Sequence, residues 1–260
     1  MHIPYSIEVY DDLVSQATQA KVWYYIQNQT WHQLWAPQKG ILNHYVPAVN
    51  KIDWFKDQGY RKVSSMPRCL LASDEGTLAE LHKPVHQLWT EINAKLGNKY
   101  SITGIAEGMT DPVEPPAPKD TSLNYGWRVY VNAIHNSAVT SGWYAHRDCP
   151  DLTDNTAVTM LYVLNLEWYP SWGAEVLYFP DDQEGVTGDH QQFNLKESRQ
   201  QKRDFGIGWL DQGRVVSPVP GRLIVQDGRC LHGTSLAQNS DLTYPSIKIV
   251  FRARRIVDKE

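Results

Sequence analysis

The chain has 260 residues, of which 42% are hydrophobic and 21% charged, a balance typical of one globular domain or two small ones. Its formal net charge of −4 argues against a nucleic-acid-binding protein, which would present a basic surface. The three cysteines lack metal-site spacing, and the chain has neither a signal-peptide pattern nor an apolar stretch of ~18 residues, so we expect a soluble cytoplasmic protein rather than a secreted or membrane protein.

The first part of the chain is predicted to be mainly helical. Asp11 and Asp12 are expected to cap a first helix, whose apolar stripe would be Leu13, Ala17, Ala20 and Tyr24. Residues 37–72 show no regular pattern. A stronger apolar stripe runs over residues 78–96 and stops at Gly97, and Pro84 should start a fresh helix or kink this one.

The second part of the chain is predicted to consist of short strands. It follows a proline-rich connection at residues 108–122, and turn signals separate its segments, as in an antiparallel sandwich or barrel. The predicted strands are Trp127–Ile134, Trp143–Asp148, Ala157–Leu166, Glu175–Phe179, Arg222–Gln226 and Ser246–Arg252.

We therefore expect a mainly β fold with N-terminal helices, namely a double-stranded β-helix (jelly roll) supported by packed α-helices. A single domain would cover residues 1–260, with a helical support region at 1–120 and the β-helix core at 121–260. The polar segment 181–213 is too long for a tight turn, so it is interpreted as either a mobile lid over an active site or a disordered insertion.

Three residues in the second part form a candidate metal site. His146 and Asp148 are two residues apart, so in a strand both side chains point to the same face. His232 follows an apolar strand that begins after a Pro-Gly turn. Two histidines and one carboxylate leave three positions open on an octahedral metal, which is the arrangement of non-haem Fe(II) oxygenases.

The last predicted strand carries basic residues that can bind an anion. Ser246, Lys248 and Arg252 share one face of this strand. A cation buried there needs an anionic partner, and a dicarboxylate bound beside the metal would supply one. Either basic residue can instead lie on the outward face. Lys248 is favoured because Ser246 lies next to it on the same face.

Five motifs in this order resemble the 2-oxoglutarate/Fe(II)-dependent oxygenase superfamily, most closely its prolyl-hydroxylase-like branch, over about residues 121–255. The resemblance implies a double-stranded β-helix that couples oxidative decarboxylation of 2-oxoglutarate, with O₂, to hydroxylation of a C–H bond. It implies His146, Asp148 and His232 as the catalytic iron ligands, and stimulation by ascorbate. The motifs are His146-x-Asp148, YVLN at 162–165, WGAEVLYF at 172–179, PGRLIVQDG at 220–228, and His232 followed by a basic last strand.

The same resemblance suggests residues that bind 2-oxoglutarate. In the family a basic residue on the strand after the distal histidine anchors the co-substrate, and here Lys248 is the first cation reached, with Arg252 as the alternative. Ser246 precedes Lys248, where relatives often have Arg-x-Ser. Where relatives often have Gly-Gly-Glu, this chain has Gly-Ala-Glu at 173–175. Further candidates are Tyr130 and Asn132 on the strand before the His-x-Asp motif, and Tyr162 in YVLN.

The expected reaction is hydroxylation of a prolyl residue in a peptide or of a small amino-acid-like metabolite. Asp148 favours hydroxylation over halogenation, because halogenases of the superfamily have a small residue at this position. Two alternatives remain from the sequence: a cupin-like metalloenzyme that does not use 2-oxoglutarate, and a non-catalytic jelly-roll binding module.

Overall fold

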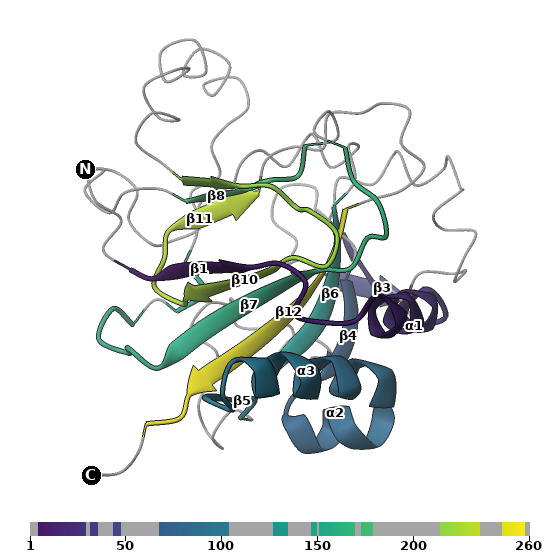
Figure 1. Ribbon diagram of the computed structural model, residues 1–260, viewed down its shortest axis with the longest axis horizontal. Coiled ribbons are helices and arrows are strands. Elements are labelled where there is room, and N and C mark those ends of the chain that lie inside the picture. Colours follow the sequence, from purple (N-terminus) through teal and green to yellow (C-terminus); the bar gives the residue numbers. More distant parts are fainter. Residues whose placement is uncertain are drawn as a thin grey trace.

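The part of the chain that can be described is mainly β, with strands in two antiparallel sheets and helices against one of them (Figure 1). None of its helices is long and apolar enough to cross a membrane. The computed structural model describes residues 5–29, 32–35, 44–47, 68–103, 127–134, 147–149, 151–169, 173–178, 214–234 and 246–257.

The larger sheet is centred on β12, which pairs with β7 on one edge and with β6 on the other. The central strands are rich in β-branched and aromatic residues, which fit a pleated surface that is buried on both sides. The strand order is β1 (Ile7–Tyr10), β10 (Leu223–Asp227), β7 (Ala157–Val163), β12 (Ser246–Arg255), β6 (Val129–Ile134), β4 (Arg68–Ala72), β2 (His32–Trp35) and β3 (His44–Pro47), and β5 (Tyr100–Ser101) also pairs with β12.

A smaller sheet lies across the opposite face of the larger one from the helices (Figure 1). It consists of β11 (His232–Thr234), β8 (Val176–Tyr178) and β9 (Arg214–Val216), in that order. Val176 and Tyr178 pack with Ile224 and Val250 of the larger sheet in one apolar cluster. We call the face of the larger sheet that carries this cluster the inner face.

The helices cover the other face of the larger sheet, which we call the outer face. Successive residues of a strand point to opposite faces, so Phe251 packs under the helices while Val250 points inward. The ring of Phe251 lies 5.3 Å from that of Trp89 on α3. The helices are α1 (Gln16–Gln27), α2 (Glu75–Leu81) and α3 (Lys83–Lys95).

The first helix differs from its prediction at its start and in its buried face. Its N-cap is Ser15, whose hydroxyl accepts a hydrogen bond from the Thr18 amide, while Asp11 forms an ion pair with Arg222. Tyr24, which was expected to be buried, is 63% exposed. The residues buried instead are Thr18, Gln19, Val22, Trp23 and Ile26. Apolar and polar residues are mixed around this helix, so its sequence does not show which face is buried. Packing against α3 and the sheet buries the face that carries Val22, Trp23 and Ile26.

The second helical prediction is confirmed at the break at Pro84 and over most of the apolar stripe, of which Leu81 is 61% exposed. This proline lies in the first turn of α3, where its missing N–H costs nothing, so α2 ends and a fresh helix begins. Gly97 follows α3 with φ +80°, a conformation that favours glycine. The apolar stripe is buried at Leu78, Val85, Leu88 and Ile92.

Strands before residue 121 also belong to the larger sheet, so the N-terminal part does more than supply helices. β1 pairs with β10, and β4 pairs with β6. The prediction of irregular structure over residues 37–72 is therefore wrong at β3 and β4. Of the strand predicted at Trp143–Asp148, only the last two residues are described, and they do not lie in a strand. The segment 181–213 lies outside the described residues.

Candidate active site

Two of the three predicted metal ligands converge in the structure. Asp148 Oδ2 lies 3.5 Å from His232 Nε2, and each side chain is only 7% exposed. Two ligands at right angles around a metal, each about 2.1 Å from it, lie about 3.0 Å apart. The observed separation therefore suits a shared ion after a small adjustment. His146 lies outside the described residues. Among the described residues, no three His, Cys, Asp or Glu side chains are grouped so that they could hold a metal ion.

The imidazole of His232 is held in the orientation that a metal ligand needs. Its Nδ1 lies 3.0 Å from the Cys230 carbonyl oxygen. A carbonyl oxygen can only accept a hydrogen bond, so Nδ1 carries the hydrogen. In the neutral ring this leaves the lone pair on Nε2, which faces Asp148. Such a contact to the remote nitrogen fixes the tautomer of metal-binding histidines.

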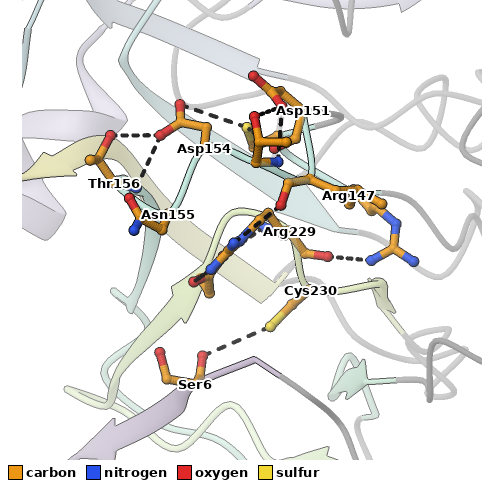
Figure 2. A network of polar contacts seen from close by, with 12 residues as sticks. Ser6, Arg147, Asp151, Asp154, Asn155, Thr156, Arg229 and Cys230 are labelled. Carbon is orange, nitrogen blue, oxygen red and sulfur yellow. Dashed lines mark hydrogen bonds and ion pairs between the residues drawn. The ribbon is translucent and has the colours of Figure 1, made fainter.

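The segment that carries Asp148 is tied to the turn that precedes His232 (Figure 2). The Cys149 amide donates a hydrogen bond of 2.8 Å to the Gly228 carbonyl oxygen. On the other side of Asp148, the Arg147 guanidinium donates to the Arg229 carbonyl oxygen. These contacts bring the two ligands together although they are far apart in the sequence.

The turn itself is held by an ion pair between Asp227 and Arg229. The Asp227 carboxylate accepts hydrogen bonds from the Arg229 backbone amide at 3.0 Å and from its guanidinium at 2.8 and 2.9 Å. Burial alone would raise the pKa of Asp227, but the hydrogen bonds from Arg229 outweigh this effect and the pKa is lowered. Asp227 therefore stays ionised and keeps the turn in shape at neutral pH.

Gly228 permits the close approach of the two segments. A Cβ atom at this position would lie 3.0 Å from Cys149 Cβ and 3.1 Å from Ala157 Cβ. We expect Gly228→Ala to lower the free energy of unfolding by roughly 1–3 kcal/mol, as is typical of overpacking. It should also weaken metal binding, because it pushes Asp148 away from His232.

Denaturant unfolding and Mn(II) titration of the metal-free protein measure the two effects. Gly97→Ala is the matched control, since a side chain at φ +80° is strained far from the site. It should lower stability and leave the Mn(II) affinity unchanged. Unaltered Mn(II) binding by Gly228→Ala would contradict the role given to this close approach.

Both oxygens of Asp148 have partners on the inner face of the larger sheet. Oδ1 lies 3.2 Å from Arg252 Nη2, and Oδ2 lies 3.4 Å from Gln226 Nε2. The Arg252 guanidinium also lies 5.9 Å from the ring centroid of Tyr130. Arg252 thus points inward, as its place on the strand suggested, but it already has a carboxylate partner.

Lys248 is the second inward-pointing cation, and its surroundings differ from those of Arg252. It is 3% exposed, and its Nζ donates a hydrogen bond of 2.7 Å to the Ala174 carbonyl oxygen. Burial lowers the pKa of Lys248 to about 7, although the negative charge of Glu175 acts in the opposite direction. Within the described part of the chain Lys248 forms no ion pair. It is a buried amine that an anionic ligand would stabilise in its charged form.

The Gly-Ala-Glu turn presents the oxygen that Lys248 contacts. Gly173 and Ala174 both have positive φ, at +69° and +64°. An alanine in this conformation costs about 1–2 kcal/mol relative to the usual helical region. Trp168 Nε1 donates a hydrogen bond of 3.1 Å to the Gly173 carbonyl oxygen and holds the turn in this shape.

Asn165, the last residue of the YVLN motif, fixes the start of β12 beside Lys248. Its Oδ1 accepts a hydrogen bond of 2.7 Å from the Ile247 amide, and the Leu164 amide donates to the Ile247 carbonyl oxygen at 2.9 Å. Sequence reasoning assigned no role to Asn165. Its burial among apolar residues, at 6% exposure, requires such partners.

Ser246 and Asn132 lie near Lys248 on the inner face. Asn132 and Lys248 are directly opposite each other on β6 and β12. In the described part of the structure, Ser246 Oγ and Asn132 Oδ1 are buried without a hydrogen-bond partner. Buried polar atoms of this kind are costly, so their grouping beside a buried amine favours a polar ligand at this place.

Tyr162, which the sequence suggested as a co-substrate residue, is not part of this group. It lies in the core between the larger sheet and the helices, whereas its neighbour Leu161 lies on the inner face. Its hydroxyl is buried, and burial raises its pKa. Its side chain packs in the core cluster under the helices.

Gln226 is a second residue that sequence reasoning missed. It is completely buried on β10 and contacts both Asp148 and His232. Its Oε1 accepts a hydrogen bond of 2.6 Å from the Tyr178 hydroxyl. A glutamine at the end of the apolar run RLIVQ was a signal, because a buried amide needs specific partners.

No protein-family model matches the chain, and a search of curated proteins finds no match.

Solved structures do align with the whole chain at low similarity. A Pseudomonas putida prolyl-4-hydroxylase has 11% identity and a TM-score of 0.45, with 98% of this chain and 95% of that chain covered. The non-haem α-ketoglutarate-dependent epimerase SnoN from nogalamycin biosynthesis has 12% identity and a TM-score of 0.47, with coverages of 96% and 79%. A Trichoplax adhaerens prolyl hydroxylase bound to a peptide fragment of hypoxia inducible factor has 13% identity, a TM-score of 0.43, and coverages of 96% and 83%. These proteins are of the class that the sequence motifs resemble. TM-scores below 0.5 do not establish a shared fold.

Proposed function

We propose that this chain is a 2-oxoglutarate- and Fe(II)-dependent dioxygenase that hydroxylates a C–H bond, on a double-stranded β-helix that forms one domain over residues 1–260. The observation that carries the proposal is the buried Asp148–His232 pair, which lies over the same inner face as the buried Lys248. The two facing antiparallel sheets with a shared apolar cluster support the β-helix. Strands on both sides of residue 121 join the larger sheet, which supports a single domain.

In this proposal Asp148 Oδ2, His232 Nε2 and an imidazole nitrogen of His146 hold the iron. The carboxylate and the imidazole are both buried, so little water competes for the ligand atoms. The Cys230 carbonyl oxygen keeps the His232 lone pair on Nε2. When bound, Fe(II) together with 2-oxoglutarate and O₂ supplies the oxidation of the C–H bond.

Lys248 anchors the distal carboxylate of 2-oxoglutarate in the proposal. Four strand residues, roughly 13 Å, separate the Lys248 and Arg252 positions, and Arg252 marks the metal end because it contacts Asp148. A lysine side chain and a five-carbon diacid together can span this interval. The Ser246 hydroxyl can donate to the same carboxylate, and Asn132 Oδ1 can accept from the ammonium group.

Arg252 and Tyr130 are assigned supporting positions rather than direct co-substrate contacts. Arg252 Nη2 already contacts the carboxylate of Asp148, whereas Lys248 forms no ion pair within the described residues. Tyr130 lies under its guanidinium, where the ring face favours a cation. Arg252 therefore balances the charge of Asp148 in this proposal.

The test is a co-substrate and product assay on the purified full-length chain. Peptides with prolyl residues and small amino-acid-like metabolites are incubated with Fe(II), 2-oxoglutarate, O₂ and ascorbate. We expect a product heavier by one oxygen atom and an equal amount of succinate, both of which require Fe(II). Asp148→Ala should give neither.

Direct binding distinguishes the alternatives. 2-Oxoglutarate that chelates Fe(II) produces a visible charge-transfer absorption, which is measured under anaerobic conditions. Metal binding without this absorption would contradict the proposal in favour of a cupin-like enzyme. A lack of metal binding would favour a jelly-roll binding module.

A further inference from the structure

Gln226 is a neutral amide completely buried at the centre of the candidate site. It lies at the inner face of β10, in register with Thr159 of β7. Two residues earlier on the same face, Ile224 belongs to the apolar cluster between the sheets. An amide in such surroundings is destabilising unless its polar atoms are hydrogen-bonded. The contacts of the Gln226 amide therefore decide whether this residue stabilises or destabilises the site.

The partners of Gln226 determine which way its amide group points. Nε2 lies 3.4 Å from Asp148 Oδ2 and 3.2 Å from Nε2 of His232, the imidazole nitrogen that can accept a hydrogen bond because Nδ1 carries the hydrogen. A carboxylate only accepts hydrogen bonds, so the NH₂ group faces Asp148. Oε1 then faces Tyr178, whose hydroxyl donates to it at 2.6 Å. A flipped amide would place two acceptors together at Asp148.

Tyr178 connects the two sheets at this point. It lies on β8 of the smaller sheet, directly opposite His232 on β11, and its hydroxyl reaches Gln226 on β10 of the larger sheet. Tyr178 is buried, and its hydroxyl is the donor in this contact, because the amide oxygen of Gln226 can only accept. The Tyr178 side chain thereby links the sheet that contains β11, the strand of His232, to β10, the strand of Gln226.

We propose that Gln226, oriented by Tyr178, is a positioning residue for the two metal ligands. The inference rests on the proposed function, since it assigns Asp148 and His232 to a metal. Gln226 holds Oδ2 of Asp148 on the side of His232, while Arg252 holds Oδ1 on the other side. The carboxylate is thus fixed from both ends, and Oδ2 is the oxygen directed at Nε2 of His232. The Tyr178 hydroxyl acts through Gln226, while its ring lies 6.1 Å from the ring of His232.

The test is titration of the metal-free full-length protein with Mn(II), and with Co(II) as a spectroscopic probe of ligand geometry. Gln226→Met keeps the length of the side chain and removes its hydrogen bonds. Loss of a residue that orients metal ligands weakens binding about 10- to 100-fold. We expect at least about tenfold weaker Mn(II) binding and a shifted Co(II) ligand-field spectrum. Tyr178→Phe should weaken binding less and shift the spectrum in the same direction.

A double variant and a matched control separate positioning from packing. Gln226→Met with Tyr178→Phe should bind Mn(II) as Gln226→Met does, because the hydroxyl that Tyr178→Phe removes donates to Gln226, while the ring beside His232 stays in place. Ile224→Met changes the packing on the same face of the same strand without removing a hydrogen bond. Its Mn(II) affinity and Co(II) spectrum should equal those of the wild type.

Three results would overturn the inference. The first is a Gln226→Met protein with wild-type Mn(II) affinity and Co(II) spectrum, which would leave the proposed function intact. The second is a double variant whose loss equals the product of the two single losses. The third is a wild-type protein that binds neither metal, which would overturn the proposed function as well. If Gln226→Met does not fold, Tyr178→Phe decides by itself: it removes one oxygen atom, and an unchanged spectrum and affinity would overturn the inference.

Discussion

His232→Ala is expected to abolish Fe(II) binding, and with it all consumption of 2-oxoglutarate. Nε2 of His232 is one of the two described atoms that can bind the metal, and the Cys230 carbonyl oxygen already orients its ring. Loss of a residue that only supports a ligand costs 10- to 100-fold in affinity, so loss of the ligand itself should cost more than about 100-fold. Anaerobic Fe(II) titration of the metal-free protein measures this effect.

A histidine on a helix provides the control for this experiment. His86 is half-buried on α3 and lies 3.7 Å from the carboxylate of Glu75, on the other side of the larger sheet from the site. His86→Ala should bind Fe(II) as the wild type does. If His232→Ala also retained wild-type affinity, the assignment of the metal ligands would be wrong.

Lys248→Met is expected to raise the Michaelis constant for 2-oxoglutarate at least about tenfold, because a hydrogen bond to a charged group is worth roughly 1.5–3 kcal/mol.

The same substitution, Lys248→Met, should stabilise the folded protein in the absence of its co-substrate. Burial lowers the pKa of Lys248 to about 7, so folding disfavours its protonated form. Methionine has a similar length and no charge. We expect the free energy of unfolding to increase by at least about 1 kcal/mol at neutral pH, measured with denaturant.

The pH dependence of both quantities follows from the lowered pKa of Lys248. Between about pH 7 and 10, the unfolded chain keeps a proton on this lysine that the folded chain has lost. Stability from this group therefore rises with pH across that window and is constant below it. The advantage of Lys248→Met should be largest below pH 7 and vanish near pH 10. The affinity of the wild type for 2-oxoglutarate should fall above pH 7, where binding must first protonate the amine.

Two other variants identify the anchor. Tyr162→Phe should leave the Michaelis constant unchanged, since Tyr162 lies in the core under the helices. Arg252→Met should weaken metal binding by releasing Asp148 Oδ1. A Michaelis constant that rises in Arg252→Met but not in Lys248→Met would show that Arg252 binds the co-substrate.

The sequence by itself determined five of the strands that the structure describes, and the order of the site motifs. The runs of β-branched and aromatic residues predicted β6, β7, β8, β10 and β12, because such side chains fit a pleated sheet. The two-residue period of a strand correctly placed Lys248 and Arg252 on one face. Pro84 marked the start of a helix through its missing N–H.

Only the tertiary structure decided which face of each strand is the inner one. β7 is buried on both sides, so its sequence is apolar except for Thr159 and does not distinguish Leu161 from Tyr162. Packing of the helices on one side turned Tyr162 away from the site. The contact between Gln226 and Tyr178 joins residues 48 positions apart on two different sheets. No local sequence pattern predicts this contact, because it depends on how the two sheets pack against each other.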